Sequence, residues 1–171
     1  MSPQLVFLHG LESQPGGSKF ITLQGLGLGD VLEPDCSNLK VPSDRFRVVE
    51  TALADKQRLV LVGSSFGGLM ALKFAAAHPE QVAGMVLCAP AVHRTETGWP
   101  PPAVQRTIPV RVLQGSRDAT VPLAAVEAYC AANGLPLTVV DDDHRLGASH
   151  DVMARLVREV WELAARPTMA G

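Results

Sequence analysis

The chain has 171 residues, 47% of them hydrophobic, and a formal net charge of −2. The length suits one domain, the apolar content excludes a disordered chain, and the absence of a basic excess argues against nucleic acid as a partner. The sequence has no apolar run near the roughly 20 residues that span a bilayer, and no cationic leader at its N-terminus. We therefore expect one domain over residues 1–171, located in the cytoplasm, with no membrane span.

Short apolar segments alternate with longer amphipathic ones along the chain. The short segments predict strands at residues 4–8, 30–35, 59–62, 85–87, 110–113 and 137–140, with 30–35 the weakest because Pro34 ends it. The longer segments predict helices near residues 18–28, 43–55, 66–78, 122–132 and 148–165. Strands that are apolar on both faces suit a parallel sheet covered by helices on both sides. The fold class is therefore α/β, a doubly wound sheet of about six mostly parallel strands.

The three cysteines, Cys36, Cys88 and Cys130, are an odd number at wide spacings. They fit neither a disulfide framework nor a zinc site, so we expect them to be small buried hydrophobes in a reducing compartment. We expect no metal and no cofactor.

A G-x-S-x-G motif, Gly63-Ser64-Ser65-Phe66-Gly67, stands directly between a predicted strand and a predicted helix. That context is the one in which the motif forms a nucleophile elbow. The two glycines remove side chains that would clash in so sharp a turn, and the central serine is exposed at the sheet edge. Ser65 is the expected nucleophile; Ser64 and a turn without catalytic function are the alternatives.

A serine nucleophile needs a histidine base and an acid that orients it. In elbow hydrolases these follow in the order serine, acid, histidine. His144 comes directly after the last predicted strand and is the expected base, with His150 as the alternative. The other three histidines lie elsewhere in the pattern: His9, His78 and His93.

Asp118 is the expected acid, because it follows the strand 110–113 at the same edge of the sheet. The alternative is that Asp118 caps the helix that Pro122 opens. The aspartates at 141–143 adjoin His144 in sequence, and neighbours on an extended chain point opposite ways. We expect those three to be solvated or to form a turn.

Two backbone N–H groups should bind the oxyanion of an acyl-transfer reaction. We expect one from Phe66, next to the nucleophile, and one from Leu11, in the loop after the first strand, where Gly10 lets the chain approach. His9, Gly10 and Trp99 are expected to contact the substrate. The glycines in this region match neither the phosphate-binding nor the dinucleotide-binding pattern, which argues against a nucleotide cofactor.

In order and spacing, four segments resemble the α/β-hydrolase superfamily: LHGLES at 8–13, GSSFGG at 63–68, GSRD with the following VP within 115–122, and DHRL at 143–146. The chain is similar to the small YqiA-like bacterial esterases, and more loosely to acyl-thioesterases and serine carboxylesterases. The resemblance implies a minimal α/β-hydrolase fold that begins at the family's third strand. It also implies an acyl-enzyme mechanism without metal or cofactor. The segment at residues 93–107, where many relatives insert a helical cap, is short here, so we expect little or no cap.

The expected function is that of a serine hydrolase that cleaves small carboxylic esters or acyl thioesters through Ser65, His144 and Asp118. Its partner would be a small-molecule acyl substrate. Two other classes remain open: a hydrolase-fold protein that binds without turnover, and a flavodoxin-like or nucleotide-binding domain. Within the fold, a peptidase or a perhydrolase would use the same three residues.

Overall fold

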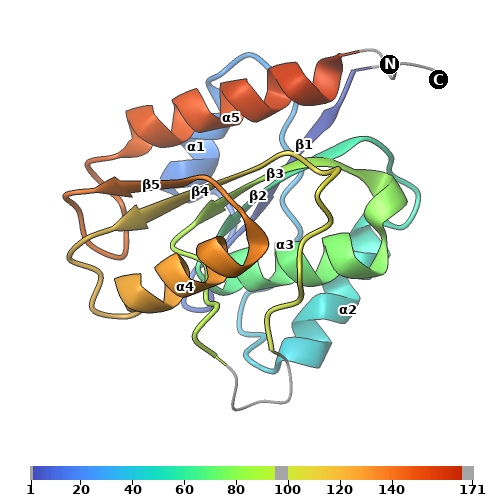
Figure 1. The fold of residues 1–171 in the computed structure, drawn as a ribbon. Coiled ribbons are helices and arrows are strands. Elements are labelled where there is room, and N and C mark those ends of the chain that lie inside the picture. Colours follow the sequence, from blue (N-terminus) through green and yellow to red (C-terminus); the bar gives the residue numbers. More distant parts are fainter. Residues whose placement is uncertain (1, 95–99, 167–171) are drawn as a thin grey trace.

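The computed structural model describes residues 2–94 and 100–166, and its centre is a parallel sheet (Figure 1). The sheet has five strands in the order β1-β2-β3-β4-β5. They are β1 (Gln4–Leu8), β2 (Leu59–Ser64), β3 (Val82–Cys88), β4 (Val110–Gly115) and β5 (Leu137–Val140). All four neighbouring pairs run parallel, so the carboxyl ends of the strands meet at one edge.

The expected strand at residues 30–35 does not form. The segment makes one isolated parallel bridge, Val6 with Leu32, at the outer edge of β1. The neighbouring N–H of Val31 instead donates to the side-chain oxygen of Gln24 at 3.0 Å, and Pro34 has no N–H to donate. The sixth strand of the prediction is therefore a single contact with the sheet.

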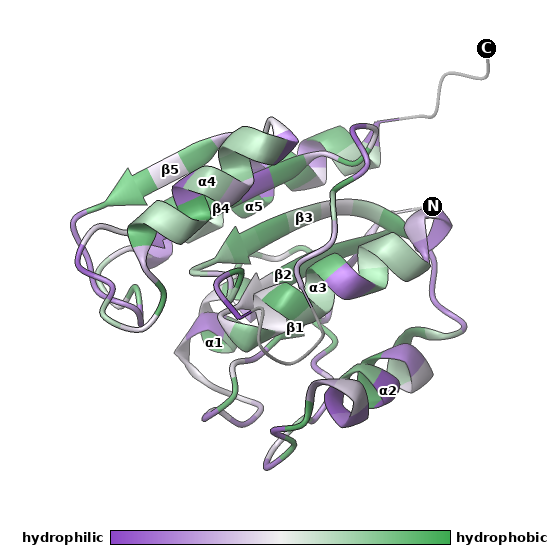
Figure 2. Cartoon of the chain, turned by 60° about the horizontal axis from the view of Figure 1, so that its bottom comes forward, coloured by the Kyte–Doolittle hydropathy of each residue, from purple (hydrophilic) through white to green (hydrophobic). Residues whose placement is uncertain are grey.

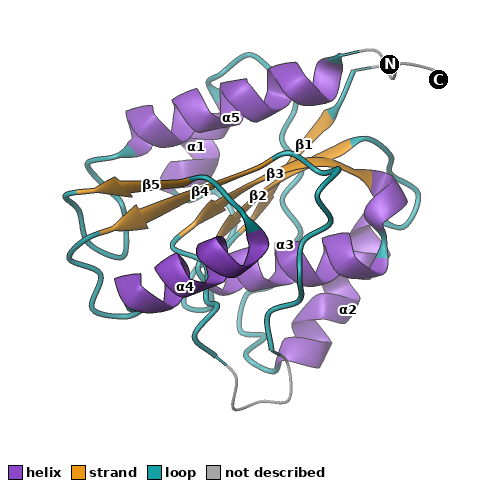
Figure 3. Ribbon diagram, viewed as in Figure 1, coloured by secondary structure: helices purple, strands orange, loops and turns teal. Residues whose placement is uncertain are grey.

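Five α-helices cover the two faces of the sheet in the described residues (Figure 3). One face carries α1 (Ser18–Gln24) and α5 (His150–Ala165). The other carries α2 (Pro42–Leu53), α3 (Phe66–Ala77) and α4 (Leu123–Asn133), and a single 3-10 turn, η1 (Pro79–Gln81), follows α3. This arrangement confirms the predicted α/β fold with helices on both sides.

Alternate residues of the strands pack into two separate hydrophobic cores, one on each face of the sheet. On β2, Leu59 and Leu61 pack toward α2 and α3, whereas Val60 and Val62 pack toward α1 and α5. Both faces of the central strands are therefore buried, which explains their nearly continuous apolar sequence. Figure 2 shows the consequence: β3 is mostly green, whereas α2 mixes green with purple.

Helix α1 is shorter than predicted. It stops at Gln24 rather than near residue 28, and the positive φ angles of Gly27 and Gly29, 72° and 91°, are incompatible with a continued helix. Between β3 and β4, the described residues 89–94 and 100–109 contain no helix, in agreement with the expected minimal cap.

Within the described part of the chain, no helix is both long enough and apolar enough to cross a membrane.

Candidate active site

Ser65 occupies the turn between β2 and α3 in a strained backbone conformation, with φ 55° and ψ −116°. Such angles are rare for a residue with a side chain and persist only where the surroundings enforce them. Here the Ser65 N–H donates to the carbonyl of Cys88 at 2.9 Å, and the Ser65 carbonyl accepts from the N–H of Ala91 at 3.0 Å. The end of β3 therefore holds the serine from both sides.

The two glycines of the motif are required by close approach of the backbone. A Cβ on Gly63 would lie 2.5 Å from the carbonyl oxygen of Gly67. A Cβ on Gly67 would overlap the carbonyl of Leu8 and lie 2.7 Å from that of His9. The start of α3 thus lies directly against the end of β1, and this contact brings the loop after β1 close to Ser65.

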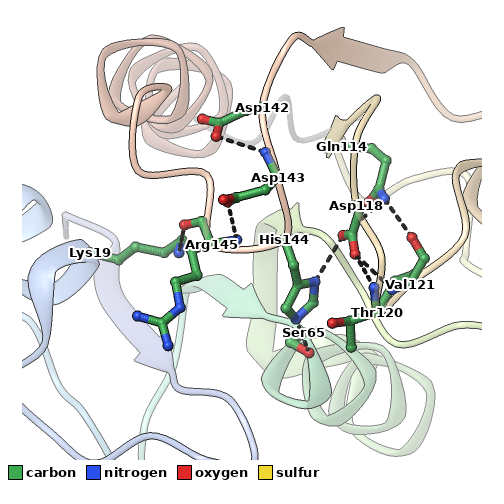
Figure 4. Close-up of polar contacts among 10 residues, drawn as sticks. All are labelled: Lys19, Ser65, Gln114, Asp118, Thr120, Val121, Asp142, Asp143, His144 and Arg145. Atoms are coloured by element: carbon green, nitrogen blue, oxygen red, sulfur yellow. Dashed lines mark hydrogen bonds and ion pairs between the residues drawn. The ribbon is translucent and has the colours of Figure 1, made fainter.

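The structure brings Ser65, His144 and Asp118 together in a hydrogen-bonded series (Figure 4). The Oγ of Ser65 lies 3.0 Å from Nε2 of His144, and Nδ1 of His144 lies 2.8 Å from Oδ2 of Asp118. The Asp118 side chain is fully buried, while His144 is 24% exposed. In this series the serine hydroxyl can donate to Nε2 and the Nδ1–H to the carboxylate.

The alternative base lies apart from this series. The Nδ1 of His150 lies 2.9 Å from the hydroxyl of Thr22, beneath the start of α5. Burial lowers the pKa of His150, so its imidazole favours the neutral form. Of the remaining histidines, His78 lies 2.7 Å from a carboxylate oxygen of Glu50.

The Asp118 carboxylate is held by three groups besides His144. Its Oδ1 accepts from the N–H groups of Thr120 and Val121 at 2.8 and 2.7 Å, and its Oδ2 accepts from Nε2 of Gln114 at 3.1 Å. Asp118 does not cap α4, whose N-cap residue is Pro122. Gln114 was not predicted from the sequence, although its polar side chain at the end of a buried strand is a signal.

The loop that carries His144 is folded around Asp142. This carboxylate is 5% exposed; its Oδ2 accepts from the Ser149 hydroxyl at 2.7 Å and its Oδ1 from the N–H of Asp143 at 2.8 Å. These hydrogen bonds, that from Ser149 foremost, lower the pKa of Asp142. The prediction that these aspartates are solvated or form a turn is confirmed for both Asp142 and Asp141. Asp142 is the buried acceptor of the turn, whereas the side chain of Asp141 is 87% exposed and pairs with Arg117.

Gly115 lets this loop approach the end of β4. A Cβ there would overlap the carbonyl oxygen of Asp142 and lie 2.8 Å from that of Asp143. On its other side, the loop is tied to α1, because the ammonium of Lys19 donates to the Arg145 carbonyl at 2.6 Å (Figure 4).

Ser65 and His144 open into a cavity of about 850 Å³ at the carboxyl edge of the sheet. Leu11 and Phe66, the two residues predicted to bind the oxyanion, line the same cavity, as does Gly10. A Cβ on Gly10 would lie 3.6 Å from Cβ of Ser65, so the loop after β1 lies beside this serine. As the first residue of α3, Phe66 has an N–H without an intrahelical acceptor. Three arginines from different loops contribute to the wall: Arg94, Arg117 and Arg145.

The prediction that His9 contacts substrate is corrected by the structure. His9 is 3% exposed, and both ring nitrogens are used within the protein. Its Nε2 accepts from the N–H of Cys36, and its Nδ1–H donates to the carbonyl of Gly10, both at 3.0 Å. Burial lowers the pKa of His9, in keeping with this neutral tautomer. Trp99, the other predicted contact, lies outside the described residues.

The cysteines are free and buried, as predicted. Burial raises the pKa of both Cys88 and Cys130 to about 11, so these thiols are poor nucleophiles at neutral pH. Among the described residues, no group of three or more histidine, cysteine, aspartate or glutamate side chains is placed to hold a metal ion.

Comparison with known proteins places this fold among α/β-hydrolases. The family "Serine aminopeptidase, S33" matches residues 43–108, a range that includes the nucleophile elbow. A solved structure from Xanthomonas campestris pv. campestris, assigned to the hydrolases of the α/β superfamily, is similar with a TM-score of 0.82 and 25% identity over 95% of this chain and 99% of that one. Mouse alpha/beta hydrolase domain-containing protein 10 follows, with a TM-score of 0.78 and 20% identity over 95% and 90% of the two chains.

Two further relatives carry names for particular reactions. Monoacylglycerol lipase from Paleococcus ferrophilus has a TM-score of 0.68 and 16% identity over 95% of this chain and 96% of that one. A protein of Oryza sativa subsp. japonica, named "Probable 1-acylglycerol-3-phosphate O-acyltransferase", is 32% identical over 113 residues. The match covers 56% of this chain, and the chain spans only about a quarter (27%) of that relative's length. The parallel sheet, the strand–elbow–helix turn and these matches together show that the chain belongs to the α/β-hydrolase superfamily.

Proposed function

We propose that the protein is a serine hydrolase that cleaves small carboxylic esters, with acyl thioesters as the second substrate class. The observation that carries this proposal is the series from Ser65 through His144 to Asp118, with contacts of 3.0 and 2.8 Å, at the wall of an open cavity. Superfamily membership supports it at the level of hydrolysis, and the small YqiA-like esterases remain the subfamily that the sequence favours.

In the proposed reaction His144 removes the proton of Ser65 as Oγ attacks the acyl carbonyl. The carbonyl oxygen becomes an oxyanion, which the N–H groups of Leu11 and Phe66 would stabilise. His144 then protonates the alcohol or thiol as its bond to the acyl carbon breaks. Water, deprotonated by His144, attacks the acyl-enzyme and releases the acid, and the proton returns to Ser65.

Asp118 would orient the imidazole and stabilise its cationic form. Its four hydrogen-bond donors support this role, because they fix both oxygens of a fully buried carboxylate. The arrangement leaves the Nε2 side of His144 facing Ser65.

The cavity favours small acyl substrates over a particular one. It is open to solvent and mixes apolar residues such as Leu11 with the three arginines of its wall. The names of the relatives add two reactions that the same residues would support, namely amide hydrolysis from the aminopeptidase family and acyl transfer from the rice protein. Both belong in the substrate test.

The test is a panel of p-nitrophenyl esters of increasing acyl length, run beside acyl-CoA thioesters and an amino-acid p-nitroanilide. Ser65→Ala should abolish turnover and labelling by a fluorophosphonate while the circular dichroism spectrum is retained. Ser64→Ala is the matched control, because it removes the neighbouring hydroxyl in the same motif and should keep both activities. Absence of both labelling and turnover in the folded wild-type protein would instead favour a binding protein; turnover in Ser65→Ala would refute the proposal.

A further inference from the structure

Arg45 is a buried cation next to the oxyanion loop. It lies on α2 and is 1% exposed. Its Nη1 donates to the carbonyl of His9 at 2.7 Å, and its Nη2 to the carbonyls of Gly10 and Cys36 at 3.0 and 3.1 Å. Its Nε donates to the carbonyl of Leu39 at 3.0 Å. Four backbone carbonyls therefore converge on one guanidinium.

Burying a guanidinium group in the protein interior costs free energy. In the described part of the chain, no carboxylate lies within ion-pair distance of Arg45, so its charge is balanced by carbonyl dipoles and by the ring of Phe66, 5.3 Å away. A buried cation without a counter-ion is a poor source of stability compared with an apolar side chain of the same volume. Its hydrogen bonds instead define where these carbonyls point.

Of these four carbonyls, that of Gly10 belongs to the peptide whose N–H, from Leu11, is proposed to bind the oxyanion. It accepts from Arg45 Nη2, from His9 Nδ1 at 3.0 Å and from the N–H of Ser13 at 3.2 Å. In a planar trans peptide, the carbonyl of one residue and the N–H of the next point in opposite directions. Holding the Gly10 oxygen on the Arg45 side therefore turns the Leu11 N–H away from Arg45.

Leu11 lines the cavity together with Ser65 and Phe66, whereas Arg45 is not among the lining residues. A Cβ on Gly10 would lie 3.6 Å from Cβ of Ser65, so the Gly10–Leu11 peptide lies beside the serine. We propose that Arg45, assisted by His9, is the positioning residue of the oxyanion hole: it fixes the Gly10–Leu11 peptide so that its N–H faces the oxygen that becomes negative. This inference rests on the proposed function and adds two residues that never touch the substrate.

The test compares Arg45→Met with Gln81→Met. Gln81 is the matched control, because it is 6% exposed and its Nε2 bridges two carbonyls, those of Leu53 and Lys56 at 2.8 Å each, far along the chain from the oxyanion loop. Both variants lose a buried donor and should lower the Tm. Only Arg45→Met should lower kcat on a p-nitrophenyl ester, by about 10- to 100-fold, with KM nearly unchanged, because the oxyanion exists only in the transition state.

An inhibitor provides a second readout. A trifluoromethyl ketone adds Ser65 to give a tetrahedral oxyanion, so Arg45→Met should weaken its inhibition by a factor similar to the loss in kcat. Arg45→Lys keeps a donor at this place and should recover part of both. A loss of Tm without a change in kcat or in inhibition, as in Gln81→Met, would reduce Arg45 to a structural residue and overturn the inference.

Substitutions of His9 keep the inference testable if Arg45→Met does not fold. An asparagine amide reaches about as far as Nδ1 of histidine, whereas a glutamine amide reaches about as far as Nε2. His9→Asn can thus keep the donor to Gly10, and His9→Gln can keep the acceptor for Cys36. We expect kcat to fall less in His9→Asn than in His9→Gln, and the reverse order would contradict the inference. Absence of turnover in the wild-type protein would instead count against the proposed function.

Discussion

Ser65 and its two polar partners, His144 and Asp118, are positioned in different ways. The elbow at residues 63–68 is set by backbone contacts so close that Gly63 and Gly67 leave no room for a Cβ. The loops at 114–121 and 141–149 also meet closely, at Gly115, but most of their hydrogen bonds come from side-chain carboxylates and an amide that accept from or donate to the backbone. Where positioning is steric, one added methyl group should abolish the native arrangement. Where it depends on hydrogen bonds, each lost bond should weaken the arrangement in part, and the strength of the bonds depends on the ionisation of the carboxylates.

Gly67→Ala should have the largest effect, because the added methyl overlaps the Leu8 carbonyl and backbone cannot move aside cheaply. We expect either no folded protein or a Tm lower by more than about 10 °C, together with loss of fluorophosphonate labelling. Gly147→Ala is the control, since a Cβ there has no neighbour within 4 Å and should change little. Equal Tm values for the two variants would show that the elbow is not set sterically.

Asp118→Asn should come next and act mainly on activity. The asparagine oxygen can still accept from Thr120 and Val121, which keeps the turn. Its amide nitrogen would then face two donors, Gln114 Nε2 and His144 Nδ1, and so would favour the wrong tautomer of the imidazole. We expect kcat to fall by about 10³- to 10⁴-fold, with a Tm lower by about 5 °C because two buried donors lose their acceptor. A kcat near that of the wild type would mean that His144 needs no oriented acid.

This contrast also explains what the sequence could reveal. The elbow is local: strand, G-x-S-x-G and helix are contiguous, so Ser65 and its glycines were predicted from the pattern. The positions of His144 and Asp118 followed from a rule about parallel sheets, namely that strand carboxyl ends share an edge. The doubly wound fold was predictable for a similar reason, because strands buried on both faces leave an apolar sequence.

The residues that hold the loops were not predictable in this way. Arg45 acts on carbonyls 35 and 36 positions earlier in the chain, and no local motif encodes such contacts. One signal was present, because Arg45 shares the buried face of α2 with Val49 and Leu53 at helical spacing. Residues 30–35 failed for a different reason: their pairing with β1 does not extend beyond the Val6–Leu32 bridge, and Pro34 has no N–H with which to continue it.

Asp142→Asn should have a moderate effect that depends on pH. The carboxylate accepts from Ser149, Ala148 and Asp143, and an amide cannot accept from all three. We expect the Tm at pH 7 to fall by about 5 °C. Because folding lowers the pKa of Asp142, the ionised form stabilises the native state above the unfolded pKa of about 3.9, and this contribution is lost as pH falls through the folded value. The difference in Tm between wild type and variant should therefore shrink below about pH 4, and a difference that stays constant would contradict the assignment.

Asp141→Asn should have the smallest effect, although it changes the same chemical group one residue away. Its carboxylate is 87% exposed, and its partner Arg117 is 62% exposed at 2.8 Å, so water already screens the pair. Arg117 also donates to the Asp141 backbone carbonyl at 3.3 Å, a contact that the substitution keeps. We expect a Tm change of less than about 1 °C that vanishes at high salt. A loss as large as that of Asp142→Asn would mean that net charge in the 141–143 run, rather than the buried hydrogen bonds of one carboxylate, holds the loop that presents His144 to Ser65.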